Sequence, residues 1–160
     1  MGGIPHDCTP ETSLSIPNSG ERFRLREGCQ MRPVDDKWPV TNPYGVKDSR
    51  YAAGYHTGVD FGCPVGTPVR APQGGKVITA KYDDDYGNYV TIMYTPRKGD
   101  KKLFLLAHNS ELLVKAGQTV KRGQVVAKSG ESGNTRGAHV HAEKRHSPFG
   151  YHNTEKPPWR

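Results

Sequence analysis

The chain has 160 residues, of which 33% are hydrophobic, 19 are glycine and 13 are proline. This length suits one domain, and the abundance of turn-forming residues argues against a helical bundle and for a β-rich fold. The formal net charge of +7 suggests a polyanionic partner, such as nucleic acid, an anionic lipid surface or an anionic cell wall. No membrane insertion is expected, because the longest apolar run, Leu103 to Ala107, is far shorter than the about 20 residues needed to span a bilayer.

Residues 1–37 are predicted to form an irregular N-terminal arm, because they hold four prolines and show no sustained hydrophobic period. Within this arm, residues 21–27 alternate polar and apolar side chains, which indicates one short strand. The start of the chain has no basic segment followed by an apolar run, so a secretory signal is not expected. Cys8 and Cys29 are interpreted either as a disulfide that leaves Cys63 free or as reduced thiols.

From Trp38 onward, short runs of β-branched and aromatic residues alternate with turn signals. Regular short strands of this kind are typical of antiparallel β architectures, and the Gly-rich segments between them predict hairpins. Residues 110–116 are the segment expected to form a helical turn or two. Strands are expected at 76–82, 89–94, 103–108, 124–128 and 139–143.

Histidine and aspartate residues recur in these β-type contexts. His56 and Asp60 are four residues apart, and in extended chain such residues point to the same side. His139 and His141 share a strand face, which suits two metal ligands or one ligand and a neighbour. His108 ends an apolar run, where a core residue would normally be apolar. Two His and one Asp fit a zinc site that keeps one position open for water, although Fe(II), Mn and Co accept the same donors.

Several ordered motifs make residues 40–145 similar to the lysostaphin-type (LytM-type) zinc peptidoglycan endopeptidases. The matching segments extend well beyond the metal motifs, and their order along the chain makes the resemblance specific. They are VTNPYG at 40–45, HTGVDF at 56–61, PVGTPVRA at 64–71, GNYVTI at 87–92, LAH at 106–108, AGQTVKRGQVVA at 116–127 and SGESGNTRGAHVHAE at 129–143.

The resemblance implies a zinc-dependent endopeptidase that cuts peptide bonds of bacterial peptidoglycan, with one Zn²⁺ per chain. Carried over position by position, it implies that His56, Asp60 and His141 are the metal ligands. It also implies that His108 and His139 are the catalytic pair, one as general base and the other bonded to the oxyanion. Which of these two histidines is the base is left open.

The resemblance also implies a domain organisation. A zinc metallopeptidase catalytic domain is expected at 38–150, between the arm at 1–37 and a C-terminal tail at 151–160. Its expected fold is mainly β, with an antiparallel β-sheet or β-sandwich core, Gly-rich hairpins, long loops around the metal groove and little helix.

Four further positions bear on the resemblance. Tyr51 and Tyr55 are candidates for the tyrosine that helps to stabilise the oxyanion in this family. Leu106 stands where the family has an aromatic residue, so one wall of the groove is expected to differ. Cys63 stands where a small residue is common, and we interpret it as a packing residue.

The expected setting is a phage endolysin or virion-associated lysin, a monomer that acts on the extracellular or periplasmic face of the cell wall. A bacterial autolysin domain and a catalytically silent LytM-like cell-wall binding or regulatory module are the alternatives. A swinging-arm carrier domain has similar hairpins, but no Met here adjoins a Lys as its modification site requires. Nucleic acid is not an expected partner, because Lys and Arg are scattered along the chain.

Overall fold

The computed structural model describes residues 30–159, so the strand expected at 21–27 and the pairing of Cys8 with Cys29 lie outside the described residues. All ten elements of 30–159 are β-strands, which confirms the predicted mainly β fold. In chain order they are β1 (Val40–Asn42), β2 (Val59–Gly62), β3 (Pro68–Arg70), β4 (Gly75–Asp83), β5 (Gly87–Arg97), β6 (Asp100–Leu112), β7 (Thr119–Val120), β8 (Val125–Ser129), β9 (His139–His146) and β10 (Thr154–Glu155). Among these residues the structure contains no helix that is long and apolar enough to cross a membrane.

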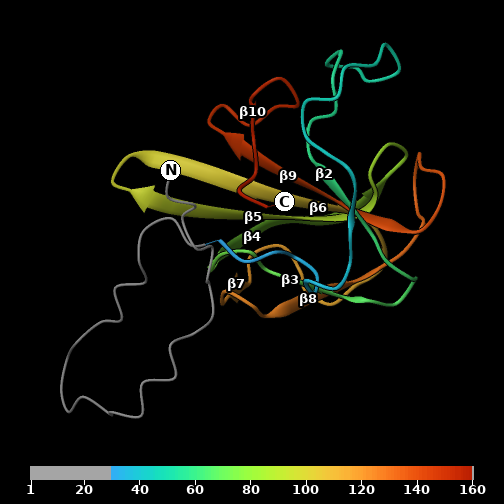
Figure 1. The fold of residues 1–160 in the computed structure, drawn as a ribbon. Coiled ribbons are helices and arrows are strands. Elements are labelled where there is room, and N and C mark those ends of the chain that lie inside the picture. The colour runs from blue at the N-terminus through green and yellow to red at the C-terminus, as the bar shows by residue number, and fades with distance from the viewer. Residues whose placement is uncertain (1–29, 160) are drawn as a thin grey trace, which may run out of the picture.

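The strands pair in antiparallel fashion and enclose the core between two layers. The order β1-β2-β9-β6-β5-β4-β7 runs across the sheet, β10 pairs with β9, and β8 pairs with both β6 and β3. Figure 1 shows β3, β7 and β8 below the layer formed by β2, β9, β6, β5 and β4. Buried side chains from both layers meet in one hydrophobic core, among them Val69 of β3, Ile92 of β5 and Val126 of β8. The expected antiparallel core is therefore present.

Strand β6 connects the two layers. Its first part pairs with β5 and β9, and its last part, Asn109–Leu112, pairs with β8, with a register shift between Asn109 and Glu111. The prediction of a helical turn at 110–116 is wrong, because Leu112 pairs with Ala127 and so continues the strand. The free backbone groups of β8 provide the hydrogen-bond partners that a local helix would otherwise supply.

The two faces of the main layer carry different side chains. On one face, Phe61 of β2 and Val140 and Ala142 of β9 are buried in the main core. Residues that alternate with them, such as Asp60 and His141, point to the opposite face, because successive side chains of a strand alternate. The sheet thus separates a hydrophobic face from a face that carries the predicted functional residues.

Leu106 and Cys63, the two residues that depart from the family pattern, both lie in the main core. Leu106 is fully buried there, next to Ala107 in sequence but on the other face of β6. The expectation that Leu106 alters a wall of the groove is therefore wrong. Cys63 is also buried in the main core, which agrees with its interpretation as a packing residue.

Both ends of the described chain contribute to the domain. Val34 and Trp159 are buried in the main core, and the Trp159 ring lies 5.5 Å from the Phe104 ring between centroids. Trp159 Nε1 donates a hydrogen bond to the Gln30 carbonyl at 3.3 Å. The division into arm, catalytic domain and tail stays a prediction. Val34 of the predicted arm and Trp159 of the predicted tail both pack into the core of the predicted catalytic domain.

Candidate metal centre

Three segments bring His56, Asp60 and His141 together. Asp60 of β2 and His141 of β9 are direct partners in the antiparallel register, so their side chains lie side by side on one face. His56 lies in the loop before β2, where its backbone amide donates to the Val46 carbonyl at 2.8 Å. The backbone register and this loop hydrogen bond therefore set the positions of all three side chains.

The facing atoms of the three residues form a compact triangle. His56 Nε2 lies 3.1 Å from Asp60 Oδ1 and 3.1 Å from His141 Nδ1, and His141 Nδ1 lies 2.7 Å from Asp60 Oδ1. Donor atoms that are each about 2.0–2.2 Å from a tetrahedral zinc ion are separated by about 3.3–3.6 Å, slightly more than observed here. Within residues 30–159, these three side chains form a group that could hold a metal ion.

The hydrogen bonds of the two rings show which nitrogens are available to a cation. His56 Nδ1 lies 3.0 Å from the Pro43 carbonyl, and His141 Nε2 lies 2.9 Å from Glu143 Oε1. Both partners are acceptors, so each neutral ring carries its proton on that nitrogen. His56 Nε2, His141 Nδ1 and Asp60 Oδ1 then direct lone pairs at one another. A cation among them removes this repulsion, and two imidazole nitrogens with a carboxylate oxygen are a donor set that suits zinc.

The pKa values of Asp60 and His141 are strongly shifted from their usual values. Burial would raise the pKa of Asp60, but its interactions with the neighbouring His141 and His56 rings hold it well below its usual range. Burial would lower the pKa of His141, but hydrogen bonds to Asp60 and Glu143 raise it to about 10. In the metal-free protein a proton on His141 therefore supplies the positive charge, and a metal ion held by Nδ1 would take the place of this proton.

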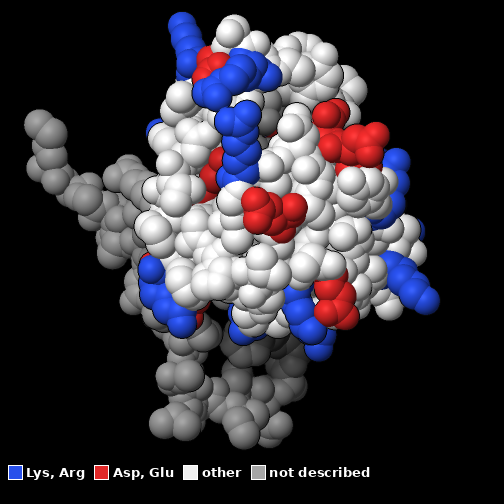
Figure 2. Space-filling model, turned by 90° about the vertical axis from the view of Figure 1, so that its right-hand side faces the viewer, with Lys and Arg blue, Asp and Glu red and all other residues white. Residues whose placement is uncertain are grey.

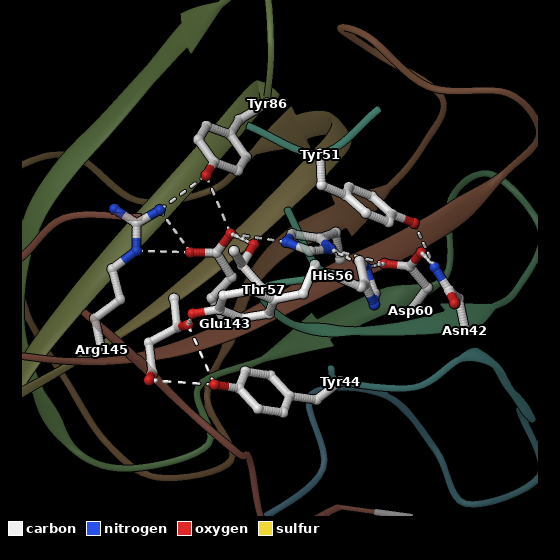
Figure 3. A network of polar contacts seen from close by, with 12 residues as sticks. Asn42, Tyr44, Tyr51, His56, Thr57, Asp60, Tyr86, Glu143 and Arg145 are labelled. Atoms are coloured by element: carbon white, nitrogen blue, oxygen red, sulfur yellow. Dashed lines mark hydrogen bonds and ion pairs between the residues drawn. The ribbon is translucent and has the colours of Figure 1, made fainter. Parts of the chain in front are cut away.

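A buried acidic network lies directly behind His141. Glu143 has no exposed surface, and its carboxylate accepts hydrogen bonds from Thr57 Oγ1 at 2.6 Å, Tyr86 OH at 3.0 Å and Arg145 Nε at 2.6 Å. Figure 3 shows Thr57, Tyr86 and Arg145 converging on Glu143, whereas Asp60 lies on the other side of the cluster, in contact with His56. Burial would raise the pKa of Glu143, but the hydrogen bond and charge of His141 and the charge of Arg145 lower it to about 2.

His108 and His139 lie beside this cluster. His108 Nδ1 donates to the Ser132 carbonyl at 2.8 Å, and His139 Nδ1 donates to the Gly137 carbonyl at 3.0 Å. Each neutral ring therefore keeps an unprotonated Nε2, and His139 Nε2 lies 3.8 Å from Asp60 Oδ1. The two ring centroids are 4.9 Å apart.

The environment of His108 keeps its ring neutral. Burial and the positive charge of protonated His141 lower the pKa of His108 to about 4, although the hydrogen bond to Ser132 opposes this shift. His108 also has a positive φ of 63°, an uncommon backbone conformation for a side chain other than glycine. The structure thus brings all five predicted site residues into one cluster, and their individual roles stay predictions.

The two candidate tyrosines differ in position. Tyr51 packs its ring 5.2 Å from the His56 ring, and its hydroxyl accepts a hydrogen bond from Asn42 Nδ2 at 2.8 Å. Asn42 Nδ2 also lies 3.5 Å from Asp60 Oδ2, so Tyr51 belongs to the metal cluster (Figure 3). The Tyr55 hydroxyl instead bonds to Thr154 Oγ1 at 2.9 Å. Tyr51 is therefore the better of the two candidates for contact with a substrate at this site.

Comparison with known proteins identifies the class of this site. The model of peptidase family M23 matches residues 54–155, which include all five predicted site residues. Because this match covers more than half of the chain, the chain belongs to peptidase family M23. The resemblance inferred from the sequence is thereby confirmed, and the proteins of this family are metallopeptidases and hence hydrolases.

Individual relatives are similar over most of this chain. Peptidoglycan DD-endopeptidase ShyA of Vibrio cholerae serotype O1 is 35% identical over 122 residues, which are 74% of this chain and 27% of that protein. Glycyl-glycine endopeptidase ALE-1 of Staphylococcus capitis is 33% identical over 114 residues, which are 71% of this chain and 31% of that protein. The chain thus spans about a third or less of the length of these curated relatives.

Solved structures of the family share the fold. The catalytic domain of lysostaphin from Staphylococcus simulans matches with a TM-score of 0.70 and 28% identity, over 76% of this chain and 90% of that chain. The catalytic domain of the prophage-encoded M23 protein EnpA from Enterococcus faecalis matches with a TM-score of 0.66 and 29% identity, over 82% and 98% of the two chains. The antiparallel fold described above is therefore that of lysostaphin-like M23 domains.

Proposed function

We propose that this chain is a zinc-dependent endopeptidase that hydrolyses peptide bonds of bacterial peptidoglycan, in the stem cross-link or in a cross-bridge. The observation that carries the proposal is the convergence of His56 Nε2, Asp60 Oδ1 and His141 Nδ1 within 3.1 Å of one another. The membership of family M23 supports the reaction, and the similarity to peptidoglycan DD-endopeptidase ShyA and glycyl-glycine endopeptidase ALE-1 supports the substrate class.

The proposed mechanism assigns proton transfer to the two neighbouring histidines. When bound, zinc would supply a Lewis acid that polarises the scissile carbonyl and acidifies a water molecule. His108 and His139 each keep Nε2 unprotonated, since both hold their Nδ1 proton on a backbone carbonyl. One ring accepts the proton of the attacking water at Nε2 and delivers it to the leaving amine. The other can donate a hydrogen bond to the oxyanion only after it has taken up a proton on its own Nε2.

We propose that the protein acts on the outside of the cell as a phage lysin. The similarity to prophage-encoded EnpA supports a phage setting. The formal net charge of +7 supports attraction to anionic cell-wall polymers. Figure 2 shows that, on the face in view, Lys and Arg are interspersed with Asp and Glu and do not gather into one basic patch. The face in view therefore gives no support to a nucleic-acid site.

Digestion of purified peptidoglycan tests the proposed reaction. The zinc-loaded protein is expected to release fragments with new amino termini, detectable by mass spectrometry, and a chelator is expected to abolish the release. Asp60→Asn should be inactive, whereas the same substitution at Asp100, in the β5–β6 hairpin, should leave activity unchanged. New reducing sugar ends would contradict the peptidase assignment. Zinc binding without any cleavage would support the silent regulatory module instead.

A further inference from the structure

Glu143 is a buried charged residue to which the proposed mechanism gives no part. It lies on β9 two residues after His141, so both side chains point to the same face of the strand. Its side chain has no exposed surface. A carboxylate is costly to bury unless it is paired and hydrogen-bonded, which raises the question of what these contacts achieve.

The two oxygens of Glu143 have separate partners. Oε2 accepts from Arg145 Nε at 2.6 Å and pairs with Arg145 NH2 at 2.5 Å. Oε1 accepts from three donors, namely Thr57 Oγ1 at 2.6 Å, Tyr86 OH at 3.0 Å and His141 Nε2 at 2.9 Å. Arg145 NH2 also donates to Tyr86 OH at 2.8 Å, which directs the Tyr86 proton toward Glu143. Every neighbour of the carboxylate is thus a donor, so the network requires an acceptor at both oxygens.

We propose that Glu143 is a positioning residue of the metal centre, which fixes the His141 tautomer and joins the two segments that carry the histidine ligands. By accepting the Nε2 proton it leaves the Nδ1 lone pair facing His56 and Asp60. By accepting the Thr57 hydroxyl proton it holds the residue next to His56. The inference rests on the proposed function, since it takes the metal to bind at His56, Asp60 and His141.

An amide cannot replace this carboxylate. If Gln occupied the position with its NH2 group toward Arg145, two donors would face each other in a buried site. With the amide reversed, its NH2 group would face His141 Nε2 and require that atom to be unprotonated. The ring proton would then lie on Nδ1, the atom that faces Asp60, and His141 would present a proton to the metal in place of a lone pair. Either orientation disturbs the network, and the second blocks the ligand atom.

Zinc affinity and the His141 tautomer test the inference without reference to catalysis. We expect Glu143→Gln to weaken zinc binding about 10- to 100-fold in competition with a chelator, the range typical of lost partners behind a metal-bound histidine. The matched control is Glu155→Gln, because Glu155 also pairs with a β9 residue, Lys144, at 3.5 Å but lies outside the cluster. The control should bind zinc as the wild type does. Equal zinc affinity in folded Glu143→Gln and wild type would overturn the inference.

Two further measurements cover the case in which Glu143→Gln does not fold. In ¹⁵N NMR spectra of the zinc-loaded wild type, His141 should carry its proton on Nε2 and bind the metal through Nδ1. The milder variant Thr57→Val should fold and lose zinc affinity severalfold, because one donor to Oε1 is removed. A proton on Nδ1 in the wild type would overturn the inference while leaving a zinc peptidase intact. A wild type that binds no zinc would overturn the proposed function and this inference with it.

Discussion

His139 and His141 share one face of β9 but have different surroundings. His141 Nδ1 lies 2.7 Å from Asp60 Oδ1, and its other nitrogen is held by buried Glu143. His139 Nε2 lies farther from the same carboxylate, at 3.8 Å, and its Nδ1 bonds to a backbone carbonyl. A site with both histidines as ligands would have four protein donors and no position for water. The geometry therefore favours His141 as the ligand and His139 as a group that moves a proton.

Substitution of each histidine separates these roles. We expect His141→Ala to purify with little zinc and no activity, because a ligand is lost. His139→Ala should retain zinc while its rate falls about 100- to 10,000-fold, the contribution typical of general acid–base catalysis, and His108→Ala should behave in the same way. Elemental analysis and peptidoglycan digestion measure the two properties. Equal zinc loss in His139→Ala and His141→Ala would indicate a closed structural site.

The ionisation of the buried Tyr94 hydroxyl affects the stability of the domain at high pH. Its ring stacks on Phe104 at 5.1 Å, and its hydroxyl accepts a hydrogen bond from Gln30 Nε2 at 2.6 Å. Burial is the main cause that raises the pKa of Tyr94 well above its usual value of about 10. Above pH 10 the unfolded chain therefore loses the tyrosine proton while the folded chain retains it.

Because the unfolded state then binds fewer protons, stability falls as the pH rises through and beyond about 10. One such group contributes a slope of at most about 1.4 kcal/mol per pH unit. We expect Tyr94→Phe to show a shallower alkaline loss of stability than the wild type in urea titrations between pH 8 and 11.5. Tyr82→Phe is the control, because Tyr82 is 56% exposed. Parallel pH profiles for Tyr94→Phe and wild type would show that Tyr94 ionises equally in both states.

At the scale of elements, the sequence predicts long strands well and short ones poorly. The segments expected at 76–82, 89–94, 103–108 and 139–143 fall within β4, β5, β6 and β9, and the segment expected at 124–128 begins one residue before β8. Strands of two to four residues, such as β7 and β10, are too short for a hydrophobic period to appear. The local pattern at the end of β6 indicates a helical turn, because its partner β8 is distant in sequence and a local pattern does not reveal such a partner.

The same limit applies to the site. His56, Asp60, His108, His139 and His141 were predictable because they stand in motifs that match a family. The residues behind them were not, since Thr57, Tyr86 and Arg145 meet Glu143 only through the fold. One signal was available in the sequence. Alternation along β9 places Glu143 and Arg145 on the same face as His141, as two-residue spacing requires.

Gly58 allows β9 to approach the loop that leads into β2. A Cβ atom at this position would lie 2.5 Å from the Ala142 carbonyl oxygen and 2.8 Å from His141 Cε1. Both distances are shorter than the 3.0 Å within which Cβ atoms essentially never approach another atom. Because the first neighbour is a backbone atom of β9, both β9 and the His141 ring would have to move. The glycine between His56 and Asp60 is thus required by the close contact between two ligand-bearing segments.

We expect Gly58→Ala to destabilise the fold by about 1–3 kcal/mol, as overpacking does, and to weaken zinc binding because His141 is displaced. Urea denaturation and chelator competition measure the two effects. Gly150→Ala is the matched control, since its Cβ would meet a single side-chain atom at 3.9 Å. If Gly58→Ala bound zinc like the control, the close approach would have no part in positioning His141.

At the scale of the whole molecule, one aromatic side chain near the end of the described chain completes the core. Trp159 lies against Phe104 and within 6.1 Å of the Phe61 ring between centroids, and it is 6% exposed. Phe61 is adjacent to Asp60 in β2, and its side chain points to the opposite face. Trp159 therefore packs behind the strand that presents Asp60, a proposed metal ligand.

Truncation of this side chain should lower the stability of the entire domain. We expect Trp159→Ala to reduce the free energy of unfolding by about 3–5 kcal/mol, the usual cost of removing a large buried aromatic group. Phe149→Ala, at a position that is 37% exposed, should cost much less. Chemical denaturation followed by circular dichroism compares the two variants. A similar small loss in both would mean that residues beyond 150 are dispensable for the core.

The opposite orientation of neighbouring side chains in β2 and β9 restricts where the chain can change in length. One inserted residue in either strand would reverse every side chain beyond it, so proposed ligands would enter the core and core residues would face the proposed metal site. Inserted residues at 47–54 and 130–138 would leave that alternation intact, because chain between strands accommodates added length. These connections can therefore change in length without turning the proposed ligands Asp60 and His141 to the other face, whereas β2 and β9 cannot.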